Sequence, residues 1–168
     1  GVQTCALPIC VLKDGNSLWW YVQSRNKKSI TLNMKDPRAQ EIARQLALDA
    51  DIVIENYRPG VLEKWNLGYE QLRAINPATI MVRLSGYGQT GPMRDAPGFG
   101  AIGESMGGLR YVSGHPDRPP VRIGISIGDS IASLHGAIGA LMALRHRDVT
   151  GGRWNGKTGA DAQAGQGQ

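Results

Sequence analysis

The sequence predicts an α/β protein whose strands form a parallel sheet. Short β-rich runs alternate with helix-like segments between residues 29 and 84, which is the pattern of strands joined by crossover helices. One run, Ile52-Val53-Ile54, is apolar at every position, as in a strand buried on both faces. Glycine is then dense, with 13 in the 54 residues 86–139, which indicates loops and close packing after the strands.

The first strand–helix–strand unit begins with a β-rich run at 29–33 (SITLN). Asp36 is a suitable N-cap and Pro37 a suitable first helical residue, so we expect a helix over about 37–50. Apolar residues four positions apart predict its buried face: Ile42, Leu46 and Ala50.

The second unit follows the turn Arg58-Pro59-Gly60. Two short helices are expected at 61–65 and 69–75, and Asn76-Pro77 ends the second one. A strand is expected at 80–84 (IMVRL), and the crossovers between such parallel strands are right-handed.

The second half of the chain predicts loops and two helices. The glycine-rich segment 101–109 is helix-like, and Gly128-Asp129-Ser130 opens a long apolar helix from 131 to about 147. No apolar run approaches about 18 residues, so we expect no membrane-spanning helix. Small residues in the long helix would allow close packing against a neighbour: Ala132, Gly136, Ala137, Gly139 and Ala140.

Composition limits the classes of partner. With 41% hydrophobic residues, the chain is globular rather than disordered. The net charge of +5 suits a polyanionic small ligand, but the basic residues are dispersed and form no nucleic-acid recognition motif. No Cys/His spacing is typical of a metal site, so none is predicted.

Both ends differ from the middle of the chain. Residues 1–10 (GVQTCALPIC) hold both cysteines and resemble the translation of a common sequencing adapter, so we expect them to be non-native. Residues 11–150, which contain no cysteine, then form the natural part of the domain, and their composition is compatible with the cytoplasm. Residues 151–168 have almost no large apolar side chains and are expected to be an aberrant or disordered tail.

Ligands of parallel α/β sheets bind beyond the carboxyl ends of the strands. Lys35, Arg58 and Lys64 follow such ends and could meet phosphate charge. Tyr57 offers an aromatic face and a hydroxyl group. The structural alternatives are a solvated lysine beside a helix start and a tyrosine packed at a strand end.

Asp129 follows an apolar stretch and directly precedes the long apolar helix. It could cap that helix, or it could be a carboxylate nucleophile that forms covalent intermediates. The helix amides and dipole would stabilise its anion in both cases. Glu104, in a second glycine-rich segment, could be an acid–base partner or a surface residue.

Residues from about 19 to 150 resemble, in order, the class III CoA-transferases, the CaiB/BaiF family that includes formyl-CoA transferase and carnitine-CoA transferase. The stretches that carry the resemblance are RNKKS (25–29), LNMKDP (32–37), IENYRPGVLEKWNLGYEQLRAINP (54–77), SGYGQTGP (85–92), GFGAIGESMGGLRYVSG (98–114), PPVRIGISIGD (119–129) and ALRHRDVTGG (143–152).

The resemblance implies part of a Rossmann-like large domain that transfers coenzyme A between carboxylic acids. Asp129 matches the aspartate that attacks the acyl-CoA thioester, giving a mixed anhydride and later an enzyme–CoA thioester. Acyl-CoA and a small carboxylic acid are then the substrates, with no permanently bound cofactor, and the intact protein is an interlocked homodimer. The positions that match coenzyme A contacts are Leu32, Asn33, Met34, Lys35, Asn56, Tyr57, Arg58 and Lys64.

Departures from the family pattern bear on the alternatives, which are an acyl-CoA racemase of the same fold and a non-catalytic CoA-binding module. The racemase histidine would fall where Phe99 stands, which favours a transferase, and Gly100 replaces an acidic residue common in the family. The family's first strand, expected before residue 11, and its second domain, expected beyond 168, are not recognised. We therefore expect this polypeptide to be a fragment with little or no turnover.

Overall fold

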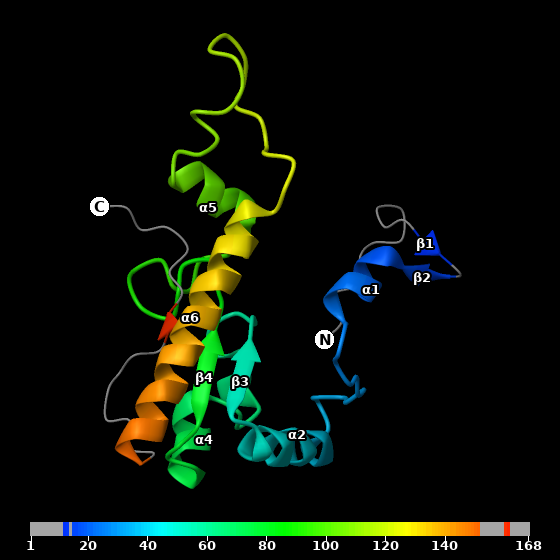
Figure 1. The fold of residues 1–168 in the computed structure, drawn as a ribbon, viewed down its shortest axis with the longest axis vertical. Coiled ribbons are helices and arrows are strands. Elements are labelled where there is room, and N and C mark those ends of the chain that lie inside the picture. Colours follow the sequence, from blue (N-terminus) through cyan, green and yellow to red (C-terminus); the bar gives the residue numbers. More distant parts are fainter. Residues whose placement is uncertain (1–11, 14, 152–159, 162–168) are drawn as a thin grey trace. The chain divides into compact units, whose positions relative to one another are not determined.

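The computed structural model describes residues 12–13, 15–151 and 160–161, and the chain divides into two units with the boundary after Asn33 (Figure 1). The predicted non-native segment 1–10 therefore lies outside the described residues, as does most of the predicted tail.

The first unit contains a small hairpin and a short helix. Strands β1 (Leu12–Lys13) and β2 (Asn16–Ser17) pair antiparallel, and α1 (Leu18–Gln23) follows directly. Ser17 caps α1, because its hydroxyl accepts a hydrogen bond of 3.2 Å from the amide of Trp19. The predicted strand at 29–33 is wrong, because none of these residues belongs to a strand of the described chain.

The second unit is built on a parallel sheet, as predicted. Strands β3 (Ile52–Glu55), β4 (Ile80–Arg83) and β5 (Ala160–Asp161) lie in the order β3-β4-β5, and both pairs are parallel. Glu55 is in register with Arg83, so the two carboxyl ends lie side by side. Strand β5 falls within the segment 151–168 that the sequence predicts to be a tail.

One face of this sheet is covered by three helices: α2 (Pro37–Asp49), α3 (Val61–Lys64) and α4 (Tyr69–Ile75). Asp36 caps α2 as predicted, since its carboxylate accepts a 2.9 Å hydrogen bond from the amide of Arg38. Four buried residues from α3, α4, the link between these two helices and β4 form the core cluster: Leu62, Leu72, Leu67 and Met81.

Two burial predictions are wrong. Ile42 and Leu46 on α2 are each 50% exposed, because the helix instead packs Ala43, Ala47 and neighbouring residues against the core cluster. Small side chains let the helix approach the core closely. Ile54 on β3 is 67% exposed, since the covering helix of that sheet face packs on β4 and β5.

That covering helix is α6 (Ile127–Thr150), which runs alongside β4 (Figure 1). Its small residues make the predicted close contact: Gly136 and Ala140 are buried, and a Cβ on Gly136 would lie 3.3 Å from Val82 Cγ1. The helix starts four residues earlier than the sequence predicts, with Ser126 at the N-cap.

Helix α6 is long and apolar enough, by length and composition alone, to cross a membrane, with 24 residues and a mean hydropathy of 1.4. Helix α6 contains no long uninterrupted apolar run, because polar residues are spaced among its alanines and leucines. The sequence therefore did not predict this property of the helix. One such helix is weak evidence for a membrane span, because core helices and signal sequences pass the same test. In this structure α6 packs on β4 and β5, with 11% of its apolar window buried.

Close glycine contacts connect the end of β4 to the start of α6. A Cβ on Gly86 would lie only 2.5 Å from Gly98 Cα, so the loop between them leaves and returns at one point. Helix α5 (Gly100–Met106) begins directly after this contact. A Cβ on Gly128, in the first turn of α6, would in turn lie 3.6 Å from Gly100 Cα.

We expect Gly136→Leu to lower the free energy of unfolding by about 1–3 kcal/mol, because the added side chain would overpack the contact with Val82. Urea denaturation followed by circular dichroism measures the change. The control is Ala137→Leu at an exposed position one residue along α6, which should stay within about 0.5 kcal/mol. Equal denaturation midpoints for the two variants would contradict the packing described here.

Candidate functional site

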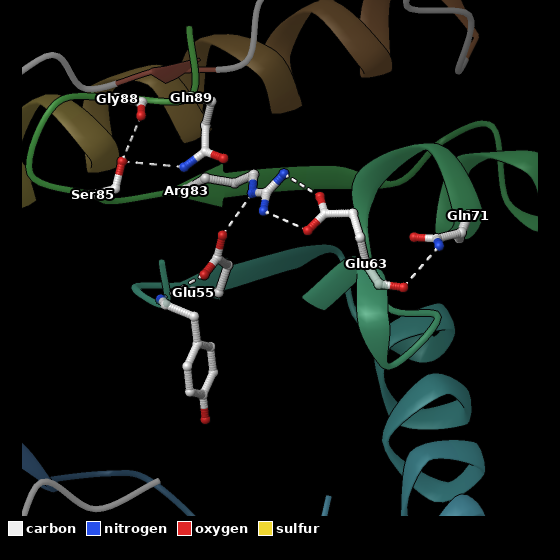
Figure 2. A network of polar contacts seen from close by, with 8 residues as sticks. Glu55, Glu63, Gln71, Arg83, Ser85, Gly88 and Gln89 are labelled. Carbon is white, nitrogen blue, oxygen red and sulfur yellow. Dashed lines mark hydrogen bonds and ion pairs between the residues drawn. The ribbon is translucent and has the colours of Figure 1, made fainter. Parts of the chain in front are cut away.

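The carboxyl ends of β3 and β4 carry a network of charged side chains (Figure 2). Arg83 Nε donates to Glu55 Oε1 at 2.6 Å, and its two terminal nitrogens donate to the Glu63 carboxylate at 2.7 and 3.2 Å. Glu63 comes from α3, so the guanidinium joins both strand ends to the first helical turn after β3. The network therefore fixes the positions of three elements at the edge where a ligand would bind.

Burial makes Glu55 and Arg83 the two members of this network that depend most on each other. The Glu55 side chain is 4% exposed and that of Arg83 is 15% exposed. Removal of the arginine would leave a buried carboxylate without its charge partner, which typically costs about 3–5 kcal/mol. Glu55 Oε2 also accepts a 2.7 Å hydrogen bond from the amide of Tyr57, so the same carboxylate holds the first residues after β3.

Sequence reasoning did not identify this network. The parallel register pairs Glu55 with Arg83, and two opposite charges at the ends of adjacent strands are the signal that could have found it. The register itself was not evident from the sequence, because each strand is only four residues long.

The pKa of the Glu63 carboxyl lies below its ordinary value. Burial alone would raise this pKa, but the hydrogen bonds from Arg83 and the attraction of its charge outweigh the burial. The pKa of Arg83 is raised in return: burial opposes its charge, and the bonds to Glu63 and Glu55 outweigh that cost. Both Glu63 and Arg83 are therefore ionised at neutral pH.

A cavity of about 280 Å³ lies beside the network, between the start of α3 and the loop after β4. Arg94 lines it but is paired with Asp95 at 3.3 Å, and Arg83 is already bonded to two carboxylates. Its charged lining is therefore largely neutralised. The complete lining consists of Pro59, Gly60, Glu63, Arg83, Gln89, Arg94 and Asp95.

The loop after β4 is held by a second set of hydrogen bonds (Figure 2). Ser85 Oγ donates to the carbonyl of Gly88 at 2.8 Å and accepts from Gln89 Nε2 at 3.2 Å. These hydrogen bonds lie at the start of the loop whose two ends meet at the Gly86–Gly98 contact. The two ends of the loop are therefore held both by hydrogen bonds and by close packing.

Two of the predicted coenzyme A residues pack against the core cluster. Met34 and Tyr57 are partly buried and pack against the same core cluster. The Tyr57 ring contacts the Trp65 ring edge-on, with centroids 5.4 Å apart and planes at 86°. Tyr57 therefore does pack at the strand end, as the structural alternative predicts. This packing is compatible with a binding role, because Tyr57 lies just after the carboxyl end of β3.

The polar and basic candidates of this unit lie on the surface. Lys35, Asn56, Arg58 and Lys64 are all exposed. The carbonyl of Arg58 accepts a 3.2 Å hydrogen bond from Val61, the first residue of α3, and Lys64 is the last residue of that helix. Leu32, which is half-buried, and Asn33, which is exposed, belong to the first unit.

Asp129 is the third residue of α6 and not its N-cap, so the capping alternative is wrong. Its side chain is exposed, and no hydrogen bond or ion pair to its carboxylate occurs among the described residues. The carboxylate faces the start of α5, because a Cβ on Gly100 would lie 3.2 Å from its Oδ1. It lies in the first helical turn, where the helix dipole favours a negative charge.

Glu104 is a buried residue of α5, and its interpretation as a surface residue is wrong. Its carboxylate pairs with Arg110 Nε at 3.1 Å, and its side chain is 3% exposed. Phe99, which stands at the racemase histidine position, is the N-cap of α5 and is 73% exposed. Within the described ranges, no group of three His, Cys, Asp or Glu side chains could hold a metal ion.

Comparison with known proteins identifies a family. The model of "CoA-transferase family III" matches residues 6–155. The chain is 57% identical, over 82% of its length, to a succinyl-CoA–D-citramalate CoA-transferase of Chloroflexus aurantiacus. It is 48% identical, over the same share, to the succinyl-CoA–L-malate CoA-transferase beta subunit of that organism.

A solved structure shows the same fold. The crystal structure of a CAIB/BAIF family protein from Brucella suis matches with a TM-score of 0.80 and 35% identity over 90% of this chain. The match covers 40% of the Brucella chain, and those with the two Chloroflexus proteins cover 34% of each. The chain thus spans about a third of the length of the curated relatives it matches.

The lowered pKa of Glu63 predicts a pH-dependent stability. Its ion pair with Arg83 contributes at pH values above the ordinary carboxyl pKa of about 4.3, and the contribution disappears as the pH falls through the lower folded-state pKa. Glu63→Gln should therefore be less stable than the unmodified chain at pH 6, by under about 1 kcal/mol for this partly exposed pair.

Urea midpoints measured between pH 6 and pH 3 check this, and the difference should vanish toward pH 3. Arg83→Gln provides the control background, because Glu63→Gln should cause no pH-dependent change once the guanidinium is absent. A difference that grows toward low pH would contradict the assigned sign.

Proposed function

Because this chain belongs to CoA-transferase family III, we propose that it supplies the nucleophile and part of the coenzyme A site of an enzyme that moves coenzyme A from an acyl-CoA to a carboxylic acid. The position of Asp129 is the observation that carries this proposal. Its carboxylate is exposed in the first turn of α6 and has no bonding partner among the described residues, so its oxygens are free to attack.

The reaction proceeds through covalent intermediates on Asp129. One carboxylate oxygen attacks the thioester carbonyl of the donor, the carbon–sulfur bond breaks, and coenzyme A leaves as the thiolate. The thiolate then attacks the aspartyl carbonyl of the mixed anhydride, which releases the donor acid as its carboxylate and leaves an aspartyl–CoA thioester. The acceptor carboxylate repeats both steps in reverse order, so the new acyl-CoA leaves and the Asp129 carboxylate is restored.

The coenzyme A site follows the carboxyl ends of the strands. Arg58 and Lys64, exposed before and at the end of α3, meet the phosphate charges together with Lys35. Met34 and Tyr57 supply apolar and aromatic surface at the same core cluster. Asn56 offers an amide. The family resemblance also assigns coenzyme A contacts to Leu32 and Asn33, which belong to the first unit.

The named substrates of the relatives guide the choice of donor. Both Chloroflexus relatives carry succinyl-CoA in their names, with D-citramalate or L-malate as acceptor. We therefore propose succinyl-CoA as the donor for the enzyme that contains this chain, and a small carboxylic acid as the acceptor. The protein needs no permanently bound cofactor for this chemistry and acts in the cytoplasm.

The isolated 168-residue polypeptide is expected to show little or no turnover. A mixed anhydride on an exposed aspartate is open to hydrolysis, and transfer needs a site that excludes water. We therefore also propose that the intact protein is an interlocked homodimer, in which further protein surface covers the site. Large apolar side chains exposed on α6 support such an arrangement: Leu134, Leu141 and Met142.

The test uses a chimera in which the 137 aligned residues of this chain replace their counterparts in the Chloroflexus D-citramalate enzyme. Asp129→Asn should reduce transfer from succinyl-CoA by at least roughly a thousandfold, given that loss of a covalent nucleophile can cost about 10⁶ in kcat. Hydroxylamine should trap the aspartyl intermediate in the unmodified chimera and not in the variant.

Asp148→Asn is the matched control, since Asp148 is an exposed carboxylate on the same helix, and it should retain full transfer. Undiminished transfer by Asp129→Asn would overturn the proposed mechanism. Exchange of the α-proton without transfer would instead identify a racemase, and binding of coenzyme A with neither reaction would identify a binding module.

A further inference from the structure

Gly100 is the first residue of α5, and its missing side chain faces Asp129. A Cβ placed there would lie 3.2 Å from Asp129 Oδ1 and 3.9 Å from its Cγ. Apart from its chain neighbours and its own helix, no other described atom would lie within 4 Å of that Cβ. The space that glycine leaves open at this position is therefore space beside the carboxylate.

The backbone does not require glycine at this position. Gly100 is not among the described glycines with positive φ, so an alanine could adopt its conformation. Glycine within a helix costs about 1 kcal/mol relative to alanine. By contrast, close packing does require glycine at positions 86 and 98, because a Cβ on either would come within 3 Å of the other's backbone.

The open space lies at the distance from the carboxylate that a reacting carbon must reach. Attack requires the carbonyl carbon to lie about 3–3.5 Å from the nucleophilic oxygen. A Cβ on residue 100 would occupy that same distance from Oδ1, at 3.2 Å. Any side chain at residue 100 would therefore compete with substrate for one side of the carboxylate.

We propose that Gly100 determines which acids react at Asp129, an inference that rests on the proposed function. Its bare Cα leaves room for an acyl group that is substituted on the carbon next to the reacting carbonyl. A side chain at this position restricts the site to unbranched acids. Gly100 acts as a specificity-determining residue because it bounds the space around the nucleophile, and it takes no part in bond formation.

The experiment compares Gly100→Ala with the unmodified chimera described above. Two donors are used: succinyl-CoA and 2-methylsuccinyl-CoA, in which the methyl group is on the carbon next to the thioester. The ratio of kcat/KM for the branched to the unbranched donor should fall by roughly tenfold or more, which is the effect of one methyl group in a confined site. Mass spectrometry of the enzyme–CoA thioester follows the first half-reaction separately.

Gly103→Ala is the matched control. Gly103 belongs to the same helix, and a Cβ placed on it would meet nothing within 4 Å. Its donor ratio should remain that of the unmodified chimera. Gly100→Ser, which adds one oxygen at the same place, should lower the ratio at least as far as alanine does.

An unchanged donor ratio in Gly100→Ala, with thermal stability retained, would overturn the inference. Failure of both Gly100 variants to fold would overturn it as well, because the glycine would then serve packing alone. The Asp129→Asn result separates this inference from the proposed function. If that variant is inactive while Gly100→Ala keeps the normal ratio, the specificity role is wrong and the mechanism stands.

Discussion

Two close approaches between glycine backbones determine where the proposed nucleophile lies. The contact between Gly86 and Gly98 returns the loop after β4 to its starting point, so α5 begins at the carboxyl end of that strand. The contact between Gly100 and Gly128 then places the first turn of α6 against the start of α5. A side chain at Gly86 or Gly98 would overlap the opposing backbone. Asp129 therefore owes its position to a succession of small residues.

The charged network has a complementary role, because it fixes the strand ends without providing a site for anions. Arg83 is the most buried basic group at this edge, but its guanidinium is saturated by Glu55 and Glu63. In the proposed coenzyme A site, phosphate charge is therefore met by exposed residues, namely Arg58 before α3 and Lys64 at its end. In that proposal, the charges that hold the strand ends and the charges that bind the ligand belong to different residues.

Local signals in the sequence predicted much of this fold. The Asp36–Pro37 start of α2, the bounds of α4 and the strand at β4 follow from capping, proline and apolar patterns. Spacing showed which residues of α2 share a face, but which face meets the core depends on the neighbours, so the exposure of Ile42 was not predictable. The early start of α6 was missed because Ile127 and Gly128 give no strong start signal.

The candidate site residues also came from the sequence. The strand-end rule points to Tyr57, the family resemblance points to Asp129, and both assignments stay predictions. The Arg83 network and the approach of Gly100 to Asp129 join residues that are 20 or more positions apart in the chain, so they required tertiary structure.

The environments of three carboxylates support the proposal of Asp129 as the nucleophile. Glu55 is bonded to a guanidinium and a backbone amide, and Glu104 is paired with Arg110 in a buried position. Charge-assisted hydrogen bonds stabilise the anion and occupy its lone pairs, so both groups are poor nucleophiles. Asp129 has neither constraint among the described residues. It is held in place through its backbone, by the glycine contacts, so its oxygens stay available for reaction.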